Sequence, residues 1–441
     1  MRRLTRFLPL TALVLLIAVA LGAPYGFGVL AEAQFTRLVS DMADRGRDEW
    51  RLRPISYDRG YLTATARTQL VPPIGEDGRP VLAKPINLVT RFEHGVTDIR
   101  AVTRVENDDS GVLSTLFPEQ KPKLRVEAGL AGHLDARVRI PEFSWSPEIR
   151  IPALAGTRGT VERFVMTANY WHTSGSHEVT MSWPGLVMDV GDAELRVESL
   201  SMEHQMSPLL ESLWEGKSRF GIERMTLDPV LADPVIARQL SFHVDAAEED
   251  GDFDGALSAR IESFETGRED FGRQVFEWTA EGMHAQSLDS VLNTFVALQR
   301  RSTSDKGSTS TRAREEMQLY ESLSSSLQRL SAHGGRMAVP ELLLRLPEGV
   351  IEGEMELHYP ERPEAERDQP VSLLRHARGQ GVLIVDRNMV WVLPDVARNI
   401  LDRLERQNIV DGSDGRYHLD VRLDETELRL NDQVLELPPL L

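Results

Sequence analysis

The stretch AELRVESLSMEHQM, residues 193–206, alternates apolar and polar side chains with a period of two. Successive side chains of a β-strand point to opposite faces, so this alternation predicts a strand with one buried face and one solvated face. The stretches LTATARTQLV (62–71) and FGIERMTLD (220–228) show the same pattern. Turn residues such as Asp250-Gly251 separate these runs at a spacing typical of hairpins. The sequence therefore predicts a mainly antiparallel sheet from residue 47 to about residue 300.

Composition and charge restrict the kinds of chemistry this chain can carry out. Its 441 residues include 68 acidic and 50 basic side chains, which give a formal net charge of -18. An acidic chain repels phosphate backbones, so nucleic acid is not expected as a partner. The chain has no cysteine. Disulfides, thiolate metal sites, cysteine nucleophiles and lipidated-cysteine anchors are therefore excluded.

The N-terminus carries a segment that resembles a membrane anchor or a signal peptide. Arg2, Arg3 and Arg6 precede residues 7–31, which carry no charge. This length is enough to cross a bilayer, but Pro9 and the residues after 23 leave an uninterrupted apolar run that is also of signal-peptide length. Residues 1–31 are thus expected to be either an uncleaved transmembrane helix or a cleaved leader. In both cases the arginines place the N-terminus in the cytoplasm and the body outside.

Amphipathic helices are expected at three places outside the predicted sheet. Apolar residues at helical spacing predict a juxtamembrane helix over residues 32–46, and a second helix from Ala313 that ends at Gly334-Gly335. A third helix is expected from near Pro394 to about Gln407.

The same pattern divides the chain beyond the leader into two regions. A first β-rich region spans 47–300, and a helix followed by a C-terminal β-rich region spans 301–441, with a Ser/Thr-rich mobile loop at 301–314. The C-terminal region ends in a hairpin of alternating residues. The predicted fold class is α+β, predominantly antiparallel β.

Two stretches invite a chemical interpretation. Asp250, Asp252 and Asp254 in EEDGDFDG match the opening of a calcium loop, but Ile261 stands where that loop requires a carboxylate, so an acidic hairpin turn is predicted instead. His172 and His177 in WHTSGSH have no further ligand at helical spacing. Nucleophile-elbow, P-loop and dinucleotide-binding motifs are absent from the sequence. No catalytic, cofactor-binding or metal-ligating residue is therefore predicted, and no cofactor.

Four short motifs resemble the YdgA-like family of bacterial envelope proteins. They are YDRGYLTATA after the apolar segment, a Trp-x-Gly step into a strand, a Pro-x-Gly turn, and a closing hairpin, and they supply Tyr57, Arg59, Gly60, Tyr61, Trp214, Gly216, Pro347, Gly349 and Asn431. The family consists of inner-membrane-anchored or periplasmic proteins of unknown function. The resemblance therefore implies a single-pass protein of the bacterial inner membrane with a periplasmic body, and it brings no active site.

The first of these motifs lies in ISYDRGYLTATARTQL, residues 55–70, which the pattern predicts to be a strand with an Arg-Gly step at its start. Gly60 is expected to let the chain bend or bulge as it enters the sheet. Arg59 is expected to pair with a carboxylate or to cap backbone carbonyls near that bend. All nine motif residues are thus expected to be structural.

The sequence favours a non-enzymatic envelope protein, anchored in the inner membrane, that binds another envelope component through a sheet groove or a sheet edge. A lipid is one candidate ligand and another envelope protein is a second. The first alternative is an envelope hydrolase whose site is assembled from residues distant in sequence. The second is a structural or assembly protein that acts as a homo-oligomer.

Overall fold

The computed structural model describes residues 25–436, except 27, 38, 41, 44–48, 75–79, 81–83, 107–110, 130–131, 149–153, 155, 303–308, 364–375, 393–394, 408, 411, 413, 425–426 and 432. The chain divides into two compact units. Unit 1 comprises residues 1–202 with 226–232, and unit 2 comprises residues 203–225 with 233–441. The strands β11 (Ala193–Pro208) and β12 (Trp214–Pro229) have residues in both units.

Unit 1 begins with helical residues between 25 and 43 and is otherwise dominated by strands. Its elements are β1 (Arg51–Arg59), β2 (Thr63–Val71), β3 (Ile86–His94), β4 (Asp98–Val105), α2 (Val112–Leu116), β5 (Lys123–Gly129), β6 (His133–Ile140), β7 (Phe143–Trp145), β8 (Gly159–Val161), β9 (Phe164–Trp171) and β10 (His177–Val190). Strands β1 to β6 pair in sequence order, β6 pairs with β9, and β10 pairs with both β8 and β9. All these pairings are antiparallel.

Unit 2 contains the longer strands and the larger helices. Its further elements are β13 (Val235–Glu249), β14 (Asp252–Thr266), β15 (Glu269–Asp270), β16 (Gln274–His284), α3 (Ala285–Ser302), α4 (Thr309–His333), β17 (Gly335–Leu346), β18 (Gly349–Tyr359), β19 (Arg378–Asp386), η3 (Arg387–Val392), α5 (Asp395–Arg406), β20 (Arg416–Asp424), β21 (Glu427–Leu430) and β22 (Gln433–Glu436). The order of antiparallel pairing is β13-β14-β16-β17-β18-β19-β20-β21-β22, with β15 added to β14.

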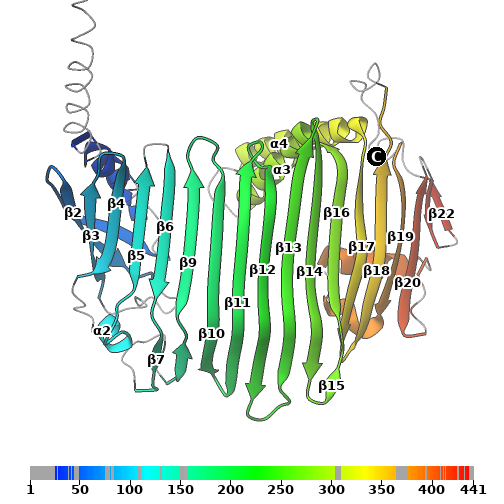
Figure 1. The fold of residues 1–441 in the computed structure, drawn as a ribbon. Helices are drawn as coiled ribbons and strands as arrows, with labels where there is room; N and C mark the ends of the chain where they lie inside the picture. The colour runs from blue at the N-terminus through cyan, green and yellow to red at the C-terminus, as the bar shows by residue number, and fades with distance from the viewer. Residues whose placement is uncertain are drawn as a thin grey trace, which may run out of the picture. The chain divides into compact units, whose positions relative to one another are not determined.

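One face of the unit 2 sheet is covered by helices at two places (Figure 1). At one place Leu330 of α4 packs with Met283 and Ala280 of β16. At the other, Met389 of η3 and Leu401 of α5 pack in a core cluster with sheet residues of β18, β19, β20 and β21. In the view of Figure 1 these helices lie behind the strands. Burial on this face comes from the apolar half of each alternating strand.

Several predictions from the sequence are confirmed by this fold. The sheet is predominantly antiparallel. The helix before Gly334 is α4, the helix predicted near 394–407 is α5, and the closing hairpin is β20 and β21. The acidic stretch at Asp250 forms the turn between β13 and β14, as predicted.

Two expectations for residues 285–314 were wrong. The region predicted to be β-rich up to 300 ends in α3, because Leu288, Val291 and Leu292 recur at helical spacing and pack on the apolar clusters of unit 2. Of the loop expected at 301–314, residues 301–302 belong to α3 and 309–314 belong to α4, whereas residues 303–308 lie outside the described residues. Extending an existing helix requires no new nucleus, which offsets the weak propensity of the Ser/Thr run.

The predicted N-terminal segment is only partly within the described residues. Residues 1–24, which contain most of the charge-free segment expected to be an anchor or a leader, lie outside them. In the part of the chain that the structure describes, none of the helices has the length and apolar character to span a bilayer. The expected helix over 32–46 is helical at its described positions up to residue 43.

Candidate functional site: an apolar groove in unit 2

Strand β18 sends residues of opposite character to the two faces of the unit 2 sheet. Gly353, Met355 and Leu357 share one face, which we call the apolar face, because side chains two apart in a strand point the same way. Glu354 and Glu356 lie between them and point to the other side, which we call the charged face. The same alternation in β19 and β20 extends both faces across three strands.

Cross-strand pairing places glycine opposite a large apolar residue on the apolar face. The pairs between β18 and β19 are Gly353 with Leu383, Met355 with Gly381, and Leu357 with Gly379. On the other side of β19, Gly381 pairs with Val421 and Gly379 with Leu423 of β20. Two successive apolar-face positions of β19 therefore carry no side chain, while the strands on both sides carry large ones.

The result is a groove with a volume of about 480 Å³. Its lining is almost entirely apolar and includes Trp278, Met337, Leu342, Met355, Gly381, Leu383, Leu419, Val421, Leu423 and Leu428. Several lining residues also belong to the clusters under the helices: Trp278 and Met337 pack with the α4 cluster, and Leu342, Leu383 and Leu428 with the η3 and α5 cluster. The groove is thus the part of the apolar face that lies between two helix-covered regions. Met355 is 57% exposed within it.

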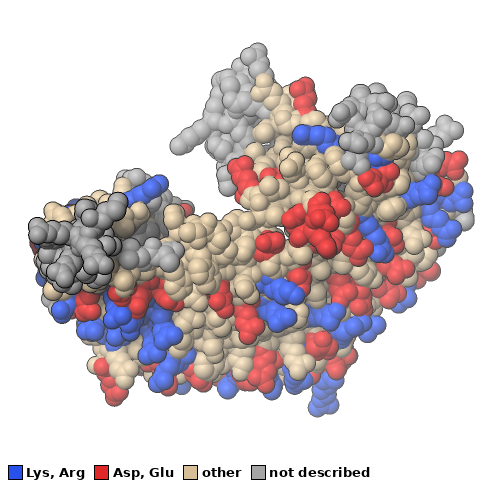
Figure 2. Space-filling model, turned by 45° about the horizontal axis from the view of Figure 1, so that its top comes forward, with Lys and Arg blue, Asp and Glu red and all other residues tan. Residues whose placement is uncertain are grey.

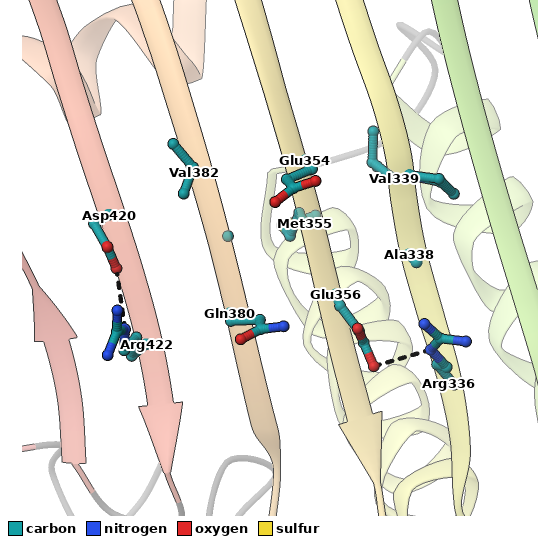
Figure 3. Close-up of a pocket in the computed structure, with 12 residues that line it drawn as sticks. Arg336, Ala338, Val339, Glu354, Met355, Glu356, Gln380, Val382, Asp420 and Arg422 are labelled. Atoms are coloured by element: carbon teal, nitrogen blue, oxygen red, sulfur yellow. Dashed lines mark hydrogen bonds and ion pairs between the residues drawn. The ribbon is translucent and has the colours of Figure 1, made fainter.

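The charged face of the same strands carries paired ions (Figure 3). Arg336 of β17 donates hydrogen bonds to Glu356 at 2.9 Å and to Glu281 at 3.1 Å. These two hydrogen bonds raise the pKa of Arg336 above its ordinary value. Asp420 and Arg422 form another ion pair at 3.4 Å. The depression of about 340 Å³ on this face is therefore lined by charges of both signs, and two of its acidic side chains, Glu356 and Asp420, are paired with arginines.

Such pairing is general on the exposed surface of the sheet. Figure 2 shows basic and acidic side chains beside one another over much of the face in view, with one group of acidic side chains near its middle. In unit 2, Arg260 of β14 pairs with Glu277 of β16, and Arg273, just before β16, pairs with Glu341 of β17. Exposed pairs of this kind contribute little to stability, about 0–1 kcal/mol each. Their effect is to leave this surface with little concentrated charge.

The acidic turn at Asp250 and the two histidines at 172 and 177 have no metal-binding arrangement among the described residues. Within these residues, no group of three or more His, Asp and Glu side chains is placed to hold a metal ion. Asp254 accepts a hydrogen bond from the backbone N–H of Gly282 at 2.8 Å, which is a structural role. His172 and His177 flank the turn between β9 and β10.

The Tyr57 motif forms a hairpin and not one strand. Residues 55–59 belong to β1, residues 63–70 belong to β2, and Arg59 pairs with Ala64 across the turn. The expected bulge lies between Pro54 and Ser56 rather than at Gly60. Gly60 instead closes the turn, with its N–H donating to the carbonyl oxygen of Thr63 at 2.8 Å. The expectation of one strand was wrong because the alternating pattern continues through a short turn.

The same motif binds the N-terminal helix to the sheet of unit 1. Arg59 donates to Glu32 of the helix at 2.7 Å, and its guanidinium lies 5.4 Å from the centre of the Tyr25 ring. The ring of Tyr57 lies 5.9 Å from Phe35 of the helix and 5.7 Å from Phe92 of β3. The carboxylate partner predicted for Arg59 is thus present.

The remaining motif residues lie at turns or close backbone contacts. Gly216 has φ +129°, and Gln205 approaches it closely. Pro347 is in the two-residue turn between Leu346 and Gly349, which pair across the hairpin of β17 and β18. The side-chain amide of Asn431 donates to the carbonyl oxygens of Ile409 and His418. Trp214 begins β12, and Tyr61 is in the turn between β1 and β2. None of them lines the groove.

Replacing Tyr57 with phenylalanine is expected to leave the free energy of unfolding at neutral pH unchanged or to raise it by up to about 1 kcal/mol. The hydroxyl of Tyr57 is buried and has no hydrogen-bond partner among the described residues. Burial raises the pKa of Tyr57 to about 12; Glu32 adds to this shift and Arg59 opposes it.

A tyrosine whose pKa is higher in the folded protein stabilises the fold below its ordinary pKa near 10, and this contribution is lost as the pH rises towards 12. When the ionisation of tyrosine is followed by ultraviolet absorbance as the pH rises, the Tyr57→Phe variant should therefore lack one transition near pH 12 that the wild type shows. If the transition lost in the variant lies near pH 10, the ordinary pKa of tyrosine, Tyr57 is not buried as described.

Most of the chain is similar to one known protein family. A family model described as a bacterial protein of unknown function (DUF945) matches residues 8–438. The chain belongs to the DUF945 family. No curated protein and no solved structure matched the chain. The DUF945 assignment agrees with the bacterial family of unknown function expected from the motifs, and it spans both units.

Proposed function

We propose that this DUF945 protein is a non-enzymatic cell-envelope protein that binds the apolar part of a lipid in the groove of unit 2. The observation that carries the proposal is the apolar groove of about 480 Å³ between two helix-covered regions of one sheet face. This volume is within the range of about 300–1,000 Å³ typical of small-molecule sites. A position in the bacterial inner membrane, through residues 1–31, and a YdgA-like identity within the family are parts of the same proposal.

The lining of the groove favours an alkyl chain over a polar ligand. Each buried CH₂ group contributes about 0.8 kcal/mol, so several such groups are enough for measurable affinity. A peptide would bring backbone N–H and C=O groups, which cost free energy when they are buried without partners. The apolar side chains of the groove offer no such partners. An alkyl chain has no polar group to leave unsatisfied.

Binding by strand addition is less well supported. Strand β1 pairs with β2, and no other partner of β1 is found among the described residues. Its sequence contains Pro54, and a bulge follows that residue. Both features interrupt the row of backbone donors that an added strand would use.

Protein extracted gently from its native membrane is expected to carry bound lipid, which mass spectrometry would detect. Changing Val421 to aspartate puts a charge in the groove and should remove this lipid, with a loss of affinity of at least about tenfold, because an unpaired charge is costly in apolar surroundings. The matched control is Gln380→Asp, which adds the same charge on the charged face of the neighbouring strand. It should retain the lipid.

Thermal unfolding of both variants would establish that they are folded. Met355→Asp is a second variant. Because Met355 is exposed in the groove, this substitution should disturb the packing of the core less than Val421→Asp does. Wild-type protein free of lipid that also fails to bind an added fluorescent fatty acid would contradict the proposed function.

A further inference from the structure

The groove has a floor and two walls that belong to three neighbouring strands. Gly379 and Gly381 of β19 form the floor. Met355 and Leu357 of β18 form one wall, and Val421 and Leu423 of β20 form the other. A methyl group added to Gly381 would lie 3.3 Å from Met355 and 3.1 Å from the carbonyl oxygen of Glu354. The depth of the groove at this point therefore depends on the absence of a side chain.

The spacing of strands sets the width of the groove. Neighbouring strands lie about 4.8 Å apart, so the backbones of β18 and β20 are about 9.6 Å apart. Side chains project from both walls into this width, which leaves space for one slender chain. A helix has a diameter of about 10–12 Å and cannot reach the floor. The groove also favours an uncharged occupant, because its lining is almost entirely apolar and the side chains that project from its two walls, Met355, Leu357, Val421 and Leu423, carry no charge.

The groove ends where the glycines end. Leu383 follows Gly381 on the same face of β19 and belongs to the cluster under η3 and α5. Beyond this point the residue without a side chain on the apolar face is Gly353 of β18, which pairs with Leu383 of β19. A ligand that continues beyond Gly381 must step sideways by one strand around Met355. A chain with rotatable bonds can follow this path, whereas a rigid ring system cannot.

We propose that the groove accepts a single linear alkyl chain, and that Met355 and Gly381 determine this specificity. The inference rests on the proposed function and narrows its ligand class. A free fatty acid and the acyl chain of a membrane lipid share this chemistry. Sterol-like fused rings are excluded by the width and by the sideways step.

The test uses two fluorescent probes with the full-length protein. One is cis-parinaric acid, a linear polyene fatty acid, and the other is dehydroergosterol, a fused-ring sterol. The wild type is expected to bind the fatty acid at least about tenfold more tightly than the sterol, a difference equal to the burial of about two CH₂ groups. Unlabelled fatty acid and phospholipid are then added as competitors, and the stronger competitor identifies the natural source of the chain.

Variants at the wall and at the floor test the two named residues. Met355→Trp fills the path from an exposed position and should weaken binding of the fatty acid about tenfold without loss of folding. Gly381→Ala should weaken it too, and Met355→Ala should reduce the preference for the fatty acid over the sterol. The control Gln380→Trp places the same bulk on the charged face of β19 and should bind like the wild type.

The outcomes separate this inference from the proposed function. If neither probe binds, the proposed function fails. If both probes bind equally well, the groove is a lipid site but its specificity for linear chains is wrong. If Met355→Trp and Gln380→Trp weaken binding to the same extent, the fatty acid does not occupy the groove described here.

Discussion

Replacing Gly216 with alanine is expected to lower the free energy of unfolding by at least about 3 kcal/mol, or to prevent accumulation of folded protein. A Cβ atom at this position would lie 2.1 Å from the carbonyl oxygen of Gln205, a separation that no real structure tolerates. Its φ of +129° also disfavours any residue with a side chain. The backbone would have to move, and urea unfolding followed by tryptophan fluorescence would measure the cost.

Gly251 provides the matched control for this prediction. Its φ is +93°, but nothing lies within 4 Å of the position that a Cβ atom would occupy. Gly251→Ala therefore carries only the conformational strain, about 1–3 kcal/mol, without the clash. Equal losses of stability in the two variants would show that the close approach of Gln205 is not what requires glycine at position 216.

The second large effect is expected from replacing Asn431 with alanine, which should cost about 2–4 kcal/mol. The amide nitrogen of Asn431 donates to the carbonyl oxygens of Ile409 at 2.9 Å and His418 at 3.1 Å. Its side-chain oxygen accepts from the N–H of Asp420 at 2.7 Å. Alanine would leave all three backbone groups without this partner, in the part of unit 2 where α5 packs on the sheet.

Two further substitutions separate the causes of this loss. Asn431 has φ +51°, so Asn431→Gly removes the hydrogen bonds but relieves the backbone strain that alanine would suffer. Asn431→Asp keeps the acceptor for Asp420 and loses the two donated hydrogen bonds. The expected order of stability is wild type, then aspartate, then glycine, then alanine. Alanine and wild type with the same denaturation midpoint would refute the role assigned to the amide.

The strands could be predicted from the sequence because their signal is local. In residues 193–206 the alternation alone indicates a strand with two different faces, and β11 has this form. The helix α4 was predictable for a similar reason, since its apolar spacing ends at Gly334. The helix α3 follows a long run of strands and was missed, although Leu288, Val291 and Leu292 already carried the helical period.

The groove could not be predicted, because it depends on which part of a sheet face the helices leave uncovered. The sequence does contain the two glycines that form the floor of the groove. They stand in Gly379-Gln380-Gly381, where glycines occupy the apolar positions of an alternating strand. What the sequence does not state is that Met355 and Val421 lie on either side of Gly381. That fact arises from strand register, which pairs Gly381 with Val421, 40 positions further along the chain.

The contact between the N-terminal helix and β3 has a mechanical consequence. Gly28 lies against His94 so closely that a Cβ atom would be 2.8 Å from the imidazole ring, and Ala31 is buried in the cluster that contains Phe92. These contacts begin within a few residues of the start of the described chain. Because Gly28 and Ala31 are packed against the sheet, tilting this helix away from β3 would first have to break the contacts with His94 and Phe92, so the helix is expected to move together with the first strands of unit 1.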